Sequence, residues 1–156
     1  MKQKRIRLKE FSYRGFYRYF VTIATRNKKK LFLEKQYVEG IELILKILAE
    51  KELFVVWGYC FMPDHLHLLL EGQSEDSDFL KFIDLFKQKS GYFFKRKFGE
   101  RLWQENYYEH ILRKEEHTEV IAKYIFENPI RKGLVSNFTD YPYLGSFLFN
   151  AKEFSL

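Results

Sequence analysis

Residues 53–72 read LFVVWGYCFMPDHLHLLLEG. The first ten of these residues are apolar on both faces of a strand, which is typical of a strand in the interior of a sheet. Pro63 and Asp64 favour a turn, and residues 65–72 supply a second apolar strand. The stretch therefore predicts an antiparallel hairpin near the middle of a sheet.

The segments on either side of this hairpin alternate between strand and helix patterns. Apolar residues three and four apart indicate amphipathic helices, and runs of aromatic and β-branched residues indicate strands. The further expected elements are strands at 16–25 and 110–113 and helices at 37–51, 78–98 and 115–128. Their order matches the ferredoxin-like split βαβ pattern. We therefore predict an α+β fold, with a ferredoxin-like antiparallel sheet, helices on one face and an extra C-terminal helix that carries a tyrosine.

The length of 156 residues fits one domain. We expect residues 1–156 to form that domain, with a core at about 16–128 and an irregular tail at 129–156. The tail begins at Pro129, which is expected to end the last helix because the residue before a proline disfavours helical geometry.

Several features bear on the location of the protein. No segment approaches the ~20 consecutive apolar residues that a membrane helix needs, and the basic start of the chain is not followed by an apolar signal region. The single cysteine, Cys60, cannot form an internal disulfide, and its apolar neighbours predict a buried strand thiol. We expect a cytoplasmic, nucleoid-associated protein without a membrane partner.

The net charge of +6 is clustered at residues 2–9, 26–30 and 87–97. Such clusters suit a polyanionic partner, because they raise the local positive potential. A solvated, solubilising surface is the alternative interpretation.

Two histidines share one face of the second hairpin strand. Alternate residues of a strand point to opposite faces, so His65 and His67 face away from Leu66, Leu68 and Leu70, which suit the core. The two imidazoles lie ~6–7 Å apart along the strand. They could converge on one metal ion and leave positions for a third ligand, water and substrate. Alternatively, they are strand histidines without a ligand.

The predicted last helix carries a candidate nucleophile. Tyr124 and Asn128 are four residues apart and so share one side of a helix. Beside them, Val120, Ile121 and Ile125 form an apolar stripe that we expect to dock the helix. A phenol attacks phosphorus when a nearby cation favours its phenolate form, and an amide oxygen suits Mg²⁺ or Mn²⁺. Alternatively, the tyrosine fills space and the asparagine only ends the helix.

Three blocks, in this order, resemble those of the REP-associated tyrosine transposases, which are single-tyrosine HUH transposases. HUH denotes a pair of histidines separated by one hydrophobic residue. The blocks are MPDHLH at 62–67, LWQENYYEHILR at 102–113 and YIFENPIRKGLV at 124–135. The stretch YPYLGS at 141–146 is similar to the end of the family pattern, from which Leu144 and Gly145 depart. The resemblance extends from about residue 16 to residue 146.

The resemblance implies that Tyr124 attacks a DNA phosphorus, forms a 5′-phosphotyrosine bond and releases a 3′-hydroxyl. It implies that His65, His67 and Asn128 hold a divalent Mg²⁺ or Mn²⁺, although some relatives have Gln at the last position. The implied substrate is single-stranded DNA beside a hairpin, in a repetitive palindromic or element-end sequence. The implied function is that of a transposase or endonuclease that cleaves and rejoins single strands.

Basic side chains are the candidate contacts to the DNA backbone. They are Arg26, Lys28, Lys29, Lys30, Lys87 and Arg113. Arg113 suits bidentate contact with a phosphate. Trp103 and His110 are expected to be structural braces or part of the DNA surface.

The residues are also compatible with two other functions. The same basic surface would serve a single-stranded nucleic-acid-binding module that does not cut, and the histidines could belong to a metal-binding structural domain without a DNA role. The sequence is compatible with a monomer or a homodimer, and with a tyrosine that serves its own subunit or a partner.

Overall fold

The computed structural model describes residues 11–155 of the chain, so the basic segment 2–9 lies outside the described residues. The sheet is built from five strands, and four α-helices cover it. The elements are β1 (Arg18–Ala24), α1 (Lys35–Lys51), β2 (Phe54–Met62), β3 (His65–Gly72), α2 (Phe79–Phe98), β4 (Tyr108–Ile111), α3 (Thr118–Phe126), α4 (Asn128–Arg131) and β5 (Leu144–Gly145). The α+β class predicted from the sequence is confirmed.

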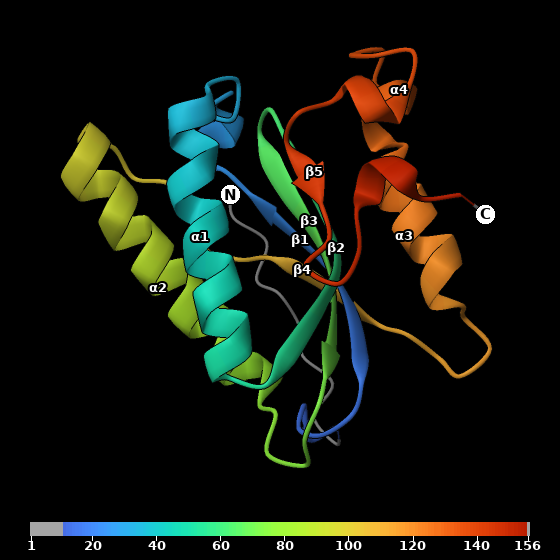
Figure 1. Ribbon diagram of the computed structural model, residues 1–156. Coiled ribbons are helices and arrows are strands. Elements are labelled where there is room, and N and C mark those ends of the chain that lie inside the picture. Colours follow the sequence, from blue (N-terminus) through green and yellow to red (C-terminus); the bar gives the residue numbers. More distant parts are fainter. Residues whose placement is uncertain (1–10, 156) are drawn as a thin grey trace.

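The predicted hairpin lies within the sheet, whose strand order is β4-β1-β3-β2-β5 with antiparallel pairing throughout. Met62 pairs with His65, so Pro63 and Asp64 form a two-residue loop between β2 and β3. The helices α1 and α2 cover one face of the sheet, and α3 and α4 lie on the other (Figure 1). This three-layer arrangement separates two apolar cores.

The first core lies between the sheet and the two long helices. Leu66, Leu68 and Leu70 of β3 are fully buried in it, which confirms the assignment of the leucine face. α2 begins and ends as its caps predict, because Asp78 accepts a hydrogen bond from the Lys81 backbone N–H and Gly99 adopts a left-handed φ of 76°.

The second core lies between the sheet and α3, where Cys60 is buried. Gly58 lies at a bulge in β2, and a Cβ atom there would meet the ring of Phe126 at 3.3 Å, so this glycine allows α3 to approach the sheet closely. The stripe expected to dock the helix is partly wrong. Ile125 is buried, but Val120 is half exposed and Ala122 and Phe126 are buried instead.

The tail, which was expected to be irregular, contributes a fifth strand. β5 pairs with the free edge of β2, where Leu144 lies opposite Cys60. The Tyr141 hydroxyl also donates a hydrogen bond of 2.6 Å to the Phe61 carbonyl oxygen. A strand of two residues has no periodicity that a sequence could reveal, so only the pairing with β2 defines it. Within residues 11–155, every helix is too short or too polar to cross a membrane.

Replacing Phe126 by alanine is expected to lower the free energy of unfolding by about 3–5 kcal/mol, because it leaves a ring-sized cavity under α3. The ring is fully buried and packs against three phenylalanine rings of the tail. Urea denaturation measures the change. Val120→Ala on the same helix is the matched control, and it should alter stability by no more than about 0.5 kcal/mol. Equal losses in the two variants would contradict this description of the second core.

Candidate metal and tyrosine site

The imidazoles of His65 and His67 face each other across a short gap. Their Nε2 atoms are 3.1 Å apart. The Nδ1 atom of His65 lies 2.7 Å from Oδ1 of Asp64, and that of His67 lies 2.9 Å from Oγ1 of Thr22. A carboxylate only accepts hydrogen bonds, so the proton of His65 belongs on Nδ1 and its Nε2 carries the lone pair. The rings are thus held by their Nδ1 atoms, with both Nε2 atoms directed at one point.

The environment of His67 keeps its ring neutral. The residue is 8% exposed, since Phe20 of β1 stacks on its ring with centroids 5.4 Å apart. Burial, followed by the charges of His65, Arg131 and Lys132, lowers the pKa of His67 to about 3. Neutral imidazole is the form that binds metal ions. The His67 imidazole is therefore neutral, and able to bind a metal ion, at every pH near neutrality.

The spacing of the pair fits a hexacoordinate divalent ion. Neighbouring ligands of an octahedral ion with bonds of about 2.1 Å lie about 3 Å apart, and the two nitrogens are 3.1 Å apart. No cluster of three His, Cys, Asp or Glu side chains suited to a metal occurs among residues 11–155. Further ligands would therefore come from an amide, from water or from a substrate phosphate.

Asn128 carries the amide predicted from the sequence to be a metal ligand, and its place in the fold differs from the prediction. The last helix breaks after Phe126, so Asn128 begins the separate α4, with Pro129 in its first turn, where the missing N–H is tolerated. Asn128 is 5% exposed, and its side-chain amide has no hydrogen-bond partner within residues 11–155. An amide without a partner among these residues is available to an ion.

Tyr124 lies on the same face of the sheet as the histidines. It is 51% exposed, so it does not share the buried position of Asn128, as continuous helical spacing had predicted. Its ring meets the ring of Phe20 edge-on with centroids 6.1 Å apart, and Phe20 in turn stacks on His67. Phe20 therefore connects the tyrosine to the histidine pair within one chain.

Arg131 of α4 holds the Tyr124 ring from the other side. Its guanidinium carbon lies 3.9 Å from the ring centroid, and Nη2 donates a hydrogen bond of 2.5 Å to the Tyr124 carbonyl oxygen. Arg131 was not singled out from the sequence, although it belongs to the third block. A cation over an aromatic face is attracted by the electrons of the ring, so Arg131 orients the phenol and places a positive charge beside it.

A basic pocket of about 470 Å³ opens beside the histidine pair. It is lined by Ala24, Lys28, Lys30, Met62, Pro63, Asp64, His65, Lys132 and Leu134. Lys28 adopts a left-handed φ of 52°, directly after Asn27 at 57°, in a tight turn at the end of β1. Non-glycine residues rarely adopt this conformation. The turn that carries Lys28 into the pocket wall therefore has an uncommon backbone shape.

The candidate DNA contacts are divided among several places. Lys28 and Lys30 line the histidine pocket, whereas Arg26 and Lys87 line a second pocket. Lys29 pairs with Glu100. Arg113 is exposed in the loop after β4, and its Nε atom lies 3.6 Å from a Glu116 carboxylate oxygen.

Trp103 and His110 act as braces. The buried Trp103 indole donates a hydrogen bond of 2.8 Å to the Ser90 hydroxyl, and Nε2 of His110 lies 2.9 Å from the Glu116 carboxylate. The Arg113 backbone N–H and His110 lower the pKa of Glu116. Both side chains therefore stabilise the fold through contacts within the protein, without a ligand.

The sheet is antiparallel, two histidines converge on one of its faces, and a separate helix places a tyrosine on that face. Residues 16–128 match the sequence model of the family described as "Transposase IS200 like". This match covers more than half of the chain, and the protein therefore belongs to the IS200-like transposase family.

The chain is also similar to individual proteins over most of its length. The REP-associated tyrosine transposase of Escherichia coli K12 is 26% identical over 137 residues, which cover 84% of this chain and 79% of the relative. An uncharacterized protein of Haemophilus influenzae is 31% identical, and the matched region covers 82% of this chain and 88% of that protein. Among solved structures, a REP-associated tyrosine transposase bound to a REP hairpin has a TM-score of 0.73 at 22% identity, covering 92% of this chain and 82% of that one. The last likeness concerns the fold alone.

Proposed function

We propose that the protein is a metal-dependent transposase or endonuclease that cleaves and rejoins single-stranded DNA beside a hairpin, with Tyr124 as nucleophile. The observation that carries this proposal is the opposed pair of Nε2 atoms, 3.1 Å apart, on the sheet face that also holds Tyr124. The similarity to the REP-associated tyrosine transposase of Escherichia coli supports the choice of substrate. The test is the formation of a denaturation-resistant complex between the protein and labelled hairpin DNA in Mn²⁺.

The fold of the catalytic core is, in our proposal, ferredoxin-like. The order β4-β1-β3-β2, with antiparallel pairing and α1 and α2 on one face, supports this description of a single domain. α3 and its tyrosine then occupy the opposite face as an addition to the core. The proposal places the tyrosine in the site of its own subunit, and the contact between the Tyr124 and Phe20 rings of one chain supports this choice.

The residues of the site have separable roles. His65, His67 and Asn128 would hold Mg²⁺ or Mn²⁺, which, when bound, polarises the scissile phosphate. Asp64 and Thr22 orient the imidazoles through their Nδ1 atoms. Lys28, Lys30 and Lys132 line the adjoining pocket and would neutralise neighbouring phosphates.

The reaction exchanges one phosphodiester bond for another. The Tyr124 oxygen loses its proton and bonds to phosphorus, the bond from phosphorus to the 3′ oxygen breaks, and that oxygen takes up a proton. The product is a 5′-phosphotyrosine and a free 3′-hydroxyl. Attack by the same or another 3′-hydroxyl reverses the step, which restores or joins strands without an external energy source.

Arg131→Gln is expected to slow adduct formation roughly tenfold, because a cation–π contact contributes up to about 2 kcal/mol and the charge favours the developing phenolate. Single-turnover kinetics measure the rate, and Arg131→Lys should restore part of it by returning the charge. Lys123→Gln, which removes an exposed charge from α3, is the control and should retain the wild-type rate. An unchanged rate in Arg131→Gln would rule out its proposed role as a positioning residue.

A further inference from the structure

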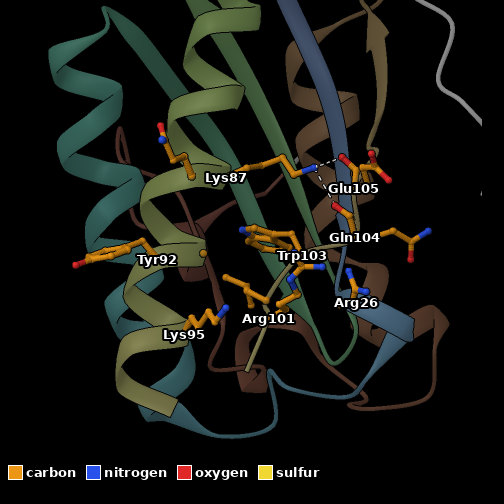
Figure 2. A pocket seen from close by; sticks show the side chains of 11 residues that line it. Arg26, Lys87, Tyr92, Lys95, Arg101, Trp103, Gln104 and Glu105 are labelled. Carbon is orange, nitrogen blue, oxygen red and sulfur yellow. Dashed lines mark hydrogen bonds between the residues drawn. The ribbon is translucent and has the colours of Figure 1, made fainter. Parts of the chain in front are cut away.

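A second pocket, of about 590 Å³, lies between α2 and the segment that follows it (Figure 2). Its lining residues are Arg26, Lys87, Gln88, Gly91, Tyr92, Lys95, Arg101, Leu102, Trp103, Gln104 and Glu105. The pocket is separate from the one beside the histidines, and the proposed chemistry does not use it.

Three cations in this pocket lack an acidic partner. Arg26, Lys95 and Arg101 lie on one side of Trp103 (Figure 2), and none of them forms an ion pair with any other residue in the range 11–155. Glu105, the acidic member of the lining, lies at the other end beside Lys87. Glu100 lines a neighbouring hollow with Arg26 and Arg101, but its carboxylate pairs with Lys29. Like charges that converge on a concave surface repel one another, and an anion relieves that repulsion.

Lys87, by contrast, has a structural function. Its ammonium donates hydrogen bonds of 2.9 and 2.5 Å to the carbonyl oxygens of Gln104 and Glu105. These bonds tie α2 to the segment that forms the opposite wall of the pocket. Lys95 belongs to the basic cluster at 87–97 that the sequence marks as a candidate DNA surface, and Arg101 adds a guanidinium to the same pocket.

The aromatic residues of the pocket do not offer a platform for a base. The Trp103 ring is buried, and its N–H is bonded to Ser90. Tyr92 is 64% exposed, but it lies at the rim with its ring turned away from the three cations (Figure 2). The pocket therefore supplies cationic side chains that can bind phosphate oxygens, and its guanidinium groups suit bidentate contact.

The two pockets are separated by a single turn of the chain. Arg26 lines the second pocket, whereas Lys28 and Lys30 line the histidine pocket. The walls are also joined, because the Gln104 backbone N–H donates to the carbonyl oxygen of Ala24, which lines the histidine pocket. Two residues of chain span at most ~7 Å, so one nucleic-acid strand could contact both pockets.

We propose that the second pocket holds the backbone phosphates of the DNA strand to one side of the cleavage site. This inference rests on the proposed function, since it assigns a further contact to the same substrate. A contact to backbone phosphates is independent of base sequence, because the phosphate groups are the same at every nucleotide. Arg26, Lys95 and Arg101 then extend the positively charged path that begins beside the histidines.

The test is a binding measurement on the double variant Lys95→Gln with Arg101→Gln. Fluorescence anisotropy compares a hairpin oligonucleotide extended by single-stranded flanks with one trimmed to the nucleotides next to the cleavage site. The variant is expected to bind the long oligonucleotide roughly tenfold more weakly at low salt, to an equal degree for unrelated flank sequences. The slope of log K against log salt should fall by about 1.4, which is about 0.7 for each lost phosphate contact. Binding of the trimmed oligonucleotide should be unchanged.

The matched control is Lys51→Gln, which removes one charge from the exposed end of α1, outside both pockets. It should alter neither affinity nor slope. Equal affinities of wild type and double variant for the long oligonucleotide would overturn the proposal, as would equal weakening for the long and trimmed ones. Displacement of the long oligonucleotide from wild type by inorganic phosphate at constant ionic strength would identify a free-phosphate site instead, which also overturns it.

A parallel adduct assay distinguishes this inference from the proposed function. The binding measurement needs no catalysis, so the pocket is tested even if the wild-type protein forms no adduct with hairpin DNA in Mn²⁺. Conversely, normal adduct formation with a double variant that binds like the wild type would reject the pocket alone. If both hold, the double variant should raise the KM for the long substrate and leave kcat unchanged, because the pocket contributes to binding and not to the chemical step.

Discussion

Tyr124→Phe is expected to abolish the covalent complex with single-stranded hairpin DNA, with a fall in rate of roughly a thousandfold or more, because the variant lacks the attacking oxygen. Binding of the DNA should change by less than about fivefold, since one hydroxyl contributes about 1 kcal/mol. Stability should change by no more than about 0.5 kcal/mol, because the side chain is half exposed. A labelled oligonucleotide and denaturing electrophoresis detect the adduct, and anisotropy measures binding.

The control for this experiment is Tyr17→Phe, which removes the hydroxyl of another partly exposed tyrosine. It should form adduct at the wild-type rate. Cleavage at full rate by Tyr124→Phe would exclude Tyr124 as the nucleophile. Tight DNA binding without any adduct in the wild-type protein, across Mg²⁺ and Mn²⁺, would favour the binding module that does not cut.

His67→Ala is expected to remove divalent-metal binding and with it the covalent adduct, again by roughly a thousandfold. The Nε2 pair loses one of its two members, and a lone imidazole of His65 with an amide leaves too few protein ligands to retain the ion. Isothermal titration calorimetry with Mn²⁺ measures metal binding independently of activity. Chelation of the wild-type protein should stop adduct formation, and added Mn²⁺ should restore it.

The matched control is His117→Ala, an exposed histidine at the start of α3 whose side chain does not cap the helix. This variant should bind Mn²⁺ as the wild type does. Asn128→Ala tests the third ligand and should weaken Mn²⁺ binding if the buried amide contributes. Unaltered Mn²⁺ affinity in His67→Ala would remove the basis for a metal at this position.

Local patterns predicted the elements that build the frame of the site. The alternation of histidine and leucine in β3 assigned Leu66, Leu68 and Leu70 to the core and the imidazoles to the other face, as the structure has them. Asp78 and Gly99 marked the ends of α2 because caps act within one helical turn. The three motif blocks led to the transposase family, which the match to residues 16–128 confirms.

Contacts between distant segments were beyond such patterns. Thr22 bonds His67 only because β1 and β3 pair in one register, and Phe20 reaches both His67 and Tyr124 for the same reason. The break between α3 and α4 separates the exposed Tyr124 from the buried Asn128, and Pro129 stands in the first turn of α4.

The sequence by itself determined the hairpin, the two faces of β3, the family and the residue types that could carry the chemistry. These properties depend on the period of a strand or helix and on residues close together in the chain. Only the tertiary structure decided that the two Nε2 atoms lie 3.1 Å apart, that Arg131 covers Tyr124 and that Arg26, Lys95 and Arg101 share a second pocket. Those arrangements depend on strand register and on side-chain packing across long separations, which no local period encodes.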